Sequence, residues 1–295
     1  MQEQHIYCTV GGFVRKFIQI IGLICFVVFG FFYTDKVMEV IREEDDIMIQ
    51  LSDIKDILKV EPVDAKITSN TMIPGLNGKS VNIDKSYKVM KSMGVFNQNE
   101  IIFDVIHPNI SMINNKDKYL IKGNNNKQMV SLILLLDSNK YLDKIEKIVD
   151  SKGITVNYFI NYGYLISNST KIKDMINQEF YSYGENGTYT PDNLLFSNNL
   201  ISRISNNNAN LCLAIDKEKN ILELCSKNDL YTITPNIIVE EHPYDTVKNN
   251  LTSGSMILLK MNNETIKELN TIIDYIKGKG LKIDGLSKLL NEELE

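Results

Sequence analysis

The stretch Met-Val-Ser-Leu-Ile-Leu-Leu-Leu-Asp-Ser, from Met129 to Ser138, decides the fold of this chain. Its apolar run does not alternate with polar residues, so the strand that it predicts is buried on both faces. Strands of this kind belong to parallel sheets, whose connections are helices. Functional groups in parallel α/β folds lie at the carboxyl ends of the strands. Asp137 therefore marks the place where a first catalytic acid is expected.

Downstream of this strand, predicted strands and helices alternate to the end of the sequence. The predicted strands are residues 155–160, 179–183, 211–214, 231–234, 256–259 and 281–283. The predicted helices are residues 141–152, 170–177, 191–205, 217–228, 244–250 and 264–279. This alternation predicts an α/β fold whose parallel sheet closes, or nearly closes, into a barrel.

An apolar segment, residues 17–33, lies near the start of the sequence. At ~1.5 Å per residue a helix of this length covers roughly 26 Å, close to the ~30 Å hydrocarbon core of a bilayer. Arg15 and Lys16 precede it and acidic residues follow it, which predicts a cytoplasmic N-terminus and an extracellular remainder. The alternative is a cleaved signal peptide. The bulky residues 31–33 offer no small-x-small cleavage site, which favours an uncleaved single-pass anchor in the cell membrane.

The order of these segments along the sequence gives the predicted domain boundaries. We expect a cytoplasmic tail (1–16), a transmembrane helix (17–33), a stalk helix (34–60), a small accessory α+β module (61–127) and the main domain (128–295). The net charge of -5 gives no electrostatic reason to expect nucleic acid as a partner.

The C-terminal part of the chain carries a family resemblance. Residues 247–260 read Val-Lys-Asn-Asn-Leu-Thr-Ser-Gly-Ser-Met-Ile-Leu-Leu-Lys, and a final Leu-Ser-Lys-Leu-Leu follows at 286–290. From Met129 onward this order resembles the polysaccharide deacetylase (NodB-homology) family. The resemblance implies a distorted (β/α) barrel that holds a divalent metal through an Asp and two His four residues apart, beside an Asp base. Such a metal polarises an amide carbonyl and activates water, while the base accepts a proton.

This chain departs from the family pattern at nearly every functional position. The aligned positions are Leu136 for the base, Asp137 for the metal-ligating Asp, Tyr183 and Gly187 for the two histidines, and Lys260 for the histidine that ends a late strand. Leucine cannot accept a proton, and neutral Tyr and Gly do not bind Zn²⁺ usefully. The resemblance therefore implies a degenerate member with vestigial pocket positions, no catalytic residues, no metal and no other cofactor.

The histidines support this interpretation. The sequence has three, His5, His107 and His242, and no two of them have the spacing of metal ligands. His5 falls on the predicted cytoplasmic side, and the other two each precede a proline. A solvated loop histidine is the simpler interpretation of His242, although a rescued ligand is the alternative.

Tyrosine and cysteine residues provide two further candidate features. Tyr183 and Tyr189 flank a glycine-containing loop after a predicted strand, where aromatic faces could stack on sugar rings; packing in the core or rim is the alternative. Cys212 and Cys225 could form a disulfide worth ~3 kcal/mol or remain two separately buried thiols.

Three functional hypotheses follow. The first is a membrane-anchored pseudoenzyme that binds cell-wall glycan, such as peptidoglycan, or a surface protein. The second is a metal-dependent hydrolase that removes N-acetyl groups from cell-wall polysaccharide; it depends on the resemblance and on Asp137 alone. The third is a structural subunit of a membrane complex that uses the stalk and the accessory module to contact a membrane protein.

Overall fold

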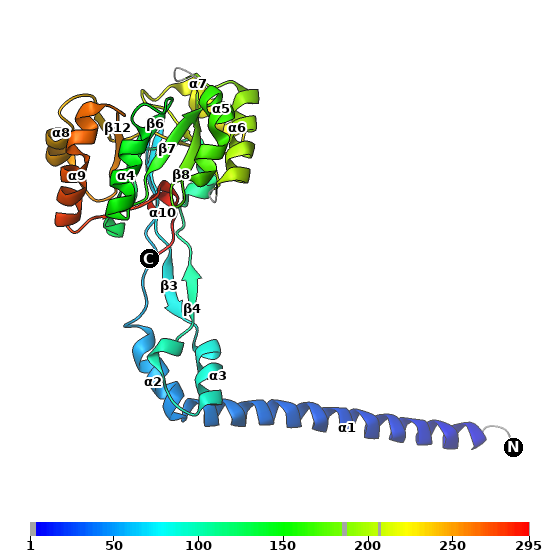
Figure 1. The fold of residues 1–295 in the computed structure, drawn as a ribbon. Helices are drawn as coiled ribbons and strands as arrows, with labels where there is room; N and C mark the ends of the chain where they lie inside the picture. The colour runs from blue at the N-terminus through cyan, green and yellow to red at the C-terminus, as the bar shows by residue number, and fades with distance from the viewer. Residues whose placement is uncertain (1–3, 185–187, 206–207, 295) are drawn as a thin grey trace. The chain divides into compact units, whose positions relative to one another are not determined.

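The computed structural model describes residues 4–184, 188–205 and 208–294, apart from the side chains of residues 4–17 and 35. The chain divides into two compact units, the first formed by Met1–Val60 and Lys79–Asp104, the second by Glu61–Gly78 and Val105–Glu295 (Figure 1). The second unit therefore includes a segment that the sequence placed in the accessory module.

The first unit combines a long helix with a small α+β fold. Its elements are α1 (Gln4–Glu43), α2 (Asp46–Lys55), β3 (Gly78–Val81), α3 (Ile83–Met93) and β4 (Phe103–Ile106), of which β3 and β4 pair. Ile47, Leu51 and Met90 form a small core between α2 and α3. Arg42, near the end of α1, pairs with Asp84, so this end of α1 is tied to α3.

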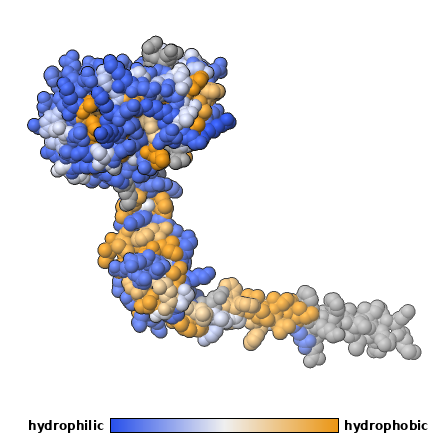
Figure 2. All heavy atoms as spheres, viewed as in Figure 1, coloured by the Kyte–Doolittle hydropathy of each residue, from blue (hydrophilic) through white to orange (hydrophobic). Residues whose placement is uncertain are grey.

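Helix α1 contains the predicted membrane segment. Residues Ile18–Glu43 are long and apolar enough to cross a bilayer, and the described side chains between Ile18 and Tyr33 are exposed (Figure 2). The predicted stalk helix at 34–60 is not one helix. α1 ends at Glu43, and a new helix begins after Asp45, whose side chain accepts a hydrogen bond from the backbone N–H of Ile47 at 3.0 Å.

The second unit contains two sheets. One has the strand order β11-β12-β6-β7-β8, all parallel, with β13 paired beside β6. Its strands are β6 (Met129–Leu136), β7 (Asn157–Asn161), β8 (Glu179–Tyr183), β11 (Ile237–Val239), β12 (Met256–Leu259) and β13 (Lys282–Ile283). The other has the order β1-β2-β5-β10-β9 and consists of β1 (Lys66–Thr68), β2 (Thr71–Ile73), β5 (Tyr119–Leu120), β9 (Leu211–Leu213) and β10 (Tyr231–Ile233).

The second sheet corrects the predicted module at residues 61–127. β5 pairs in parallel with β10, and β2 pairs in parallel with β5, so strands from this segment continue the sheet of the main domain. Met72 and Leu120 are fully buried there and belong to the same cluster as Ile133 of β6. Hydrophobic burial thus joins the segment to the main domain, whereas its strands are too short to show this from the sequence.

Helices surround the strands of the second unit (Figure 1). They are α4 (Leu142–Lys152), α5 (Tyr162–Asp174), α6 (Pro191–Ile204), α7 (Lys219–Lys227), α8 (Pro243–Asn250), α9 (Asn263–Gly278) and α10 (Leu286–Leu290). Helix α5 begins earlier than the predicted residue 170, because the Asn161 side chain caps it by accepting the Tyr164 N–H at 2.7 Å.

Strand β6 separates two cores. Its side chains alternate between the faces of the sheet, so Leu132, Leu134 and Leu136 join an outer cluster under the helices. Met129 and Ile133 join an inner cluster between the two sheets, which α10 also enters through its leucines. The predicted α/β class and the two-sided burial of β6 are confirmed. The two sheets lie on either side of the inner cluster, which is compatible with a distorted barrel.

Candidate functional site

The carboxyl ends of the first sheet bring three predicted site residues to one edge. Asp137 directly follows β6, Tyr183 ends β8 and Lys260 directly follows β12, and these strands belong to one parallel sheet. We call this edge the carboxyl edge. Asp137 and Lys260 are exposed, whereas Tyr183 is half-buried. Gly187, the fourth predicted position, lies outside the described residues.

Leu136 does not belong to the carboxyl edge. Its side chain is 1% exposed and lies in the outer cluster between the sheet and the helices. The preceding residue, Leu135, packs instead against the inner cluster, because successive side chains of a strand point to opposite faces. The position that the sequence aligned with the catalytic base therefore points away from any pocket at this edge.

The residues of the carboxyl edge do not fit a zinc site. Among the described residues, no group of three His, Cys, Asp or Glu side chains is arranged to hold a metal ion. His242 begins α8 with a φ of 49°, and His107 lies in another part of the unit, with its Nδ1 3.1 Å from Oδ1 of Asn77. One carboxylate, Asp137, is the only ligand-type group at the positions that the resemblance assigns to metal ligands.

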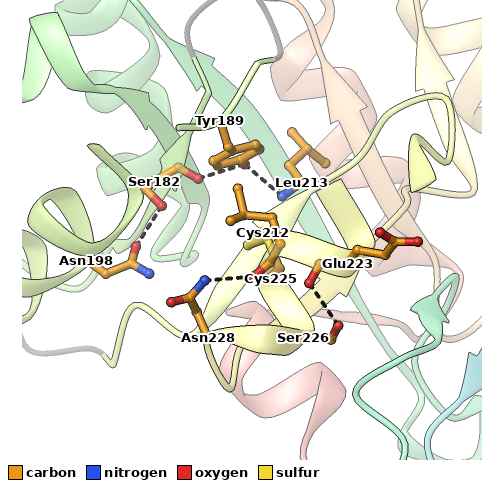
Figure 3. Close-up of a disulfide and its surroundings, with 10 residues drawn as sticks. Ser182, Tyr189, Asn198, Cys212, Leu213, Glu223, Cys225, Ser226 and Asn228 are labelled. Carbon is orange, nitrogen blue, oxygen red and sulfur yellow. Dashed lines mark hydrogen bonds between the residues drawn. A yellow bond between two sulfur atoms is a disulfide. The ribbon is translucent and has the colours of Figure 1, made fainter. Parts of the chain in front are cut away.

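Tyr183 and Tyr189 pack against each other. Their ring centroids are 6.3 Å apart with an interplanar angle of 86°. The Tyr189 hydroxyl donates to the carbonyl of Ser182 at 3.1 Å and accepts from the N–H of Leu213 at 3.0 Å, and so links β8 to β9 (Figure 3). Sugar stacking by either ring stays a prediction, but Tyr189 also has a structural role that the sequence did not reveal.

Burial raises the pKa values of both phenols. Burial raises the pKa of Tyr183, and the nearby carboxylates of Glu218 and Asp216 raise it further. Burial likewise raises the pKa of Tyr189. Both phenols are therefore neutral at physiological pH and act as hydrogen-bonding or apolar groups rather than as bases.

A disulfide joins Cys212 of β9 to Cys225 of α7 (Figure 3). The sequence left this pairing open, and both cysteines are fully buried. The bond attaches helix α7 to the sheet beside Tyr189. Disulfides form and persist mainly in oxidising compartments, so this bond bears on the location of the domain.

The amino ends of the same strands hold a buried polar network that the sequence did not predict. Glu179, the first residue of β8, accepts hydrogen bonds from the Tyr181 hydroxyl at 2.7 Å, the Ser287 N–H at 3.0 Å and the Ser287 hydroxyl. Asn157, the first residue of β7, accepts the Leu286 N–H at 2.7 Å and donates to the Leu132 carbonyl at 2.8 Å. These bonds fasten the start of α10 to the sheet (Figure 1).

A cleft of 1210 Å³ opens at these amino ends. Glu179, Leu211 and Tyr231, which begin β8, β9 and β10, line it together with residues of α10 and of the 107–114 segment. This cleft of the second unit thus lies at the end of the strands opposite to the carboxyl edge. Its lining comes from segments far apart in the sequence, so no local pattern could have predicted it.

Comparison with solved structures identifies the fold of this chain. The chain has the α/β fold of the polysaccharide deacetylases, carbohydrate esterase family 4. The distorted barrel that the family resemblance implied is compatible with its two sheets. No family model matches the sequence. Structural similarity includes the crystal structure of BA3943 from Bacillus anthracis, described as a CE4 family pseudoenzyme. It is 21% identical, with a TM-score of 0.65, over 85% of this chain and 97% of that one.

Two further proteins complete the comparison. PdaA of Bacillus subtilis, a family 4 carbohydrate esterase, is 15% identical with a TM-score of 0.51, over 60% of this chain and 86% of that one. The uncharacterized protein YlxY of Bacillus subtilis (strain 168) is 24% identical over 256 residues, which cover 79% of this chain and 80% of YlxY. A mutant of BA3943 is described as having restored enzymatic activity.

Proposed function

We propose that this chain is a membrane-anchored, extracellular protein with a polysaccharide-deacetylase-like fold that does not deacetylate and instead binds cell-wall glycan. The observation that carries the proposal is the set of residue types at the positions that the resemblance assigns to catalysis. Where the resemblance places a base, two imidazoles and an acid, the chain has Leu136, Tyr183, Gly187 and Lys260. A metal-activated water needs several strong ligands and a base, and these residue types supply neither.

Two features support the proposed location. The apolar part of α1 is long enough to cross a bilayer, and basic residues precede it while acidic residues follow it. The Cys212–Cys225 disulfide lies on the C-terminal side of this helix and favours an oxidising compartment for that side. Protease added to intact protoplasts should therefore digest the C-terminal domain, whereas full protection of that domain would contradict the proposed topology.

The binding function is tested with the full chain in detergent micelles. We expect it to sediment with purified peptidoglycan and to release no acetate from chitin oligosaccharides. The purified chain should also contain no stoichiometric divalent metal. Negligible retention on peptidoglycan would contradict glycan binding.

The same experiment separates the two alternatives. Acetate release, together with a bound metal that is lost in Asp137→Ala, would establish the hydrolase. Crosslinking in cells that recovers a membrane protein, with no retention on glycan, would establish a structural subunit. The structure adds no observation that favours either alternative over glycan binding.

A further inference from the structure

The cleft at the amino ends of the strands has the size of a ligand site. Its 1210 Å³ exceeds the ~300–1,000 Å³ that is typical of pockets for small molecules, and therefore suits a ligand of several units. The amino-end face of a barrel normally serves stability rather than binding. An open cleft at this end is therefore a feature that needs an explanation.

The walls of the cleft are held in place by the chain itself. The carboxylate of Glu292 accepts hydrogen bonds from the N–H of Gly75 at 3.1 Å, the N–H of Met112 at 2.9 Å and the hydroxyl of Ser111. These three contacts fasten the C-terminal tail to two segments that precede β6. The cleft is thus formed before a ligand arrives, which lowers the entropic cost of binding.

The buried and half-buried carboxylates of the lining already have partners within the chain. Glu179 accepts three hydrogen bonds within the chain, and Glu292 does the same. Asp284 is paired with Lys288 at 3.0 Å and with Lys282 at 2.9 Å. The other charged side chains of the lining, Lys173 and Glu293, are exposed and opposite in sign. The lining thus carries four carboxylates and two lysines, which gives no attraction to an anionic ligand. Three of the four carboxylates already accept bonds within the chain, which leaves them few free sites for a cationic one.

Apart from Lys173 and Glu293, the groups left to contact a ligand are neutral. Within the described residues, the side-chain amides of Asn114, Asn177 and Asn210 make no hydrogen bond to another residue, although each amide can both donate and accept. Beside them, Ile113 is 64% exposed and Ile176 is 68% exposed. Tyr231 is half-buried in the same lining. Apolar surface next to free amides matches a ring that carries both C–H faces and hydroxyl groups.

We propose that this amino-end cleft, and not the carboxyl edge, is the binding site for an uncharged oligosaccharide. The proposal deepens the proposed function and rests on it, because it names where glycan binds and which chemistry recognises it. The sugar rings lie against Ile113 and Ile176, and their hydroxyl and acetamido groups bond to the asparagine amides. The excess of carboxylates over lysines in the lining disfavours anionic polymers at the same site.

The test uses the full chain in detergent micelles and chitotetraose as the neutral probe, with affinity measured by calorimetry. We expect Ile176→Asp to weaken binding at least tenfold, since it puts an unpaired charge against the ring faces. Asn177→Ala combined with Asn210→Ala should weaken it to a similar extent. Ile166→Asp is the matched control, because Ile166 is 46% exposed on α5 and is not part of the lining.

A second pair of variants addresses the other end of the strands. Asp137→Ala and Lys260→Ala change exposed residues and should bind chitotetraose as the unaltered chain does. Weaker binding in these two variants, with unchanged binding in Ile176→Asp, would overturn the amino-end site and leave glycan binding intact. No binding of chitotetraose or peptidoglycan by the unaltered chain would overturn both.

A second probe tests whether the cleft binds a peptide rather than a sugar. A neutral tetrapeptide that binds with the same sensitivity to Ile176→Asp, and more tightly than chitotetraose, would identify a peptide cleft instead. Thermal unfolding of each variant, with a midpoint near that of the unaltered chain, shows that lost binding is not lost folding.

Discussion

The two ends of the strands in the second unit differ in how their polar residues are used. At the amino ends, Asn157, Glu179 and Asp284 are buried, and each is hydrogen-bonded within the chain. At the carboxyl edge, Asp137 and Lys260 are exposed. A family that keeps its chemistry at the carboxyl ends would be expected to show the opposite distribution. Here the three buried polar residues that fasten α10 and β13 to the sheet, and the cleft of 1210 Å³, lie at the amino ends.

This difference indicates which end of the strands contributes more to the stability of the domain. α10 contributes Leu286, Leu289 and Leu290 to the inner cluster, and the polar network fixes its start. The amino ends therefore stabilise the domain, whereas the carboxyl edge can vary with little cost. Changes at the two ends should differ accordingly in their effect on the free energy of unfolding.

The largest effect is expected at the core contact of α10. Leu289 is fully buried in the inner cluster, so Leu289→Ala removes apolar contacts and leaves a cavity. We expect a loss of about 3 kcal/mol in the free energy of unfolding, measured by urea denaturation of the full chain. Leu195→Ala, at a residue that is 44% exposed, should change it by less than about 0.5 kcal/mol. Equal effects would contradict the contribution of α10 to the inner cluster.

A smaller loss is expected at Gly285, where α10 begins. A Cβ at this position would overlap the carboxylate of Glu179, which other hydrogen bonds hold in place. Gly285→Ala should therefore cost about 2 kcal/mol. Gly278→Ala is the control, since a Cβ there meets nothing within 4 Å and alanine favours a helix. A neutral Gly285→Ala would show that the network is looser than its geometry indicates.

The carboxyl side of the strands has a comparable contact at Tyr189. Tyr189→Phe removes the hydroxyl that joins Ser182 to Leu213 and leaves the Leu213 N–H without this partner. A loss of about 1–1.5 kcal/mol should appear in urea denaturation. Tyr275→Phe, which removes an exposed bond of 3.4 Å, should have less effect. A Tyr189→Phe loss as large as that of Leu289→Ala would contradict the expected difference in stability between the two ends of the strands.

Asp284 should make the stability of the amino ends depend on pH. Burial opposes its ionisation, but hydrogen bonds from Lys282, the Gly285 N–H and Lys288 outweigh this and lower its pKa below the usual value of 3.8. The stabilisation is present above the unfolded pKa and is lost as pH falls through the folded one. Between about pH 5 and 3 the unaltered chain should therefore lose stability more steeply than Asp284→Asn, by under about 1 kcal/mol. Parallel curves would show that Asp284 is not responsible.

The smallest effect is expected at the exposed carboxyl edge. Asp137→Ala and Lys260→Ala should each change the free energy of unfolding by less than about 0.5 kcal/mol, because neither side chain is buried. Thermal and urea unfolding of the two variants provide the measurement. A large loss in either would reveal a structural role for this edge and weaken the comparison.

Long apolar runs made part of the fold predictable. The bounds of β8 and β12 match the predicted 179–183 and 256–259, and β6 differs by one residue at its start. β11 was missed, and so was the start of α5. β11 is short, and the beginning of α5 depends on a hydrogen bond from the Asn161 side chain rather than on periodicity. Short strands and side-chain caps leave a weaker pattern than a buried strand does.

The candidate sites also have features that the sequence could predict and features that it could not. Parallel strands end at one edge, so the sequence could place Asp137, Tyr183 and Lys260 together. It could not show that Leu136 points into the outer cluster, because that depends on which face of β6 the helices cover. The amino-end cleft draws on residues from 77 to 293, and only folding brings them together.

The sequence by itself determined the α/β class, the apolar N-terminal helix and the absence of paired histidine ligands, because these follow from residue types and local periodicity. The tertiary structure decided the disulfide, the pairing of β2 and β5 into the sheet of β9 and β10, and the position of the open cleft. Each of these depends on contacts between distant segments. Such contacts form only where burial of apolar surface brings the segments together, and no local pattern records that.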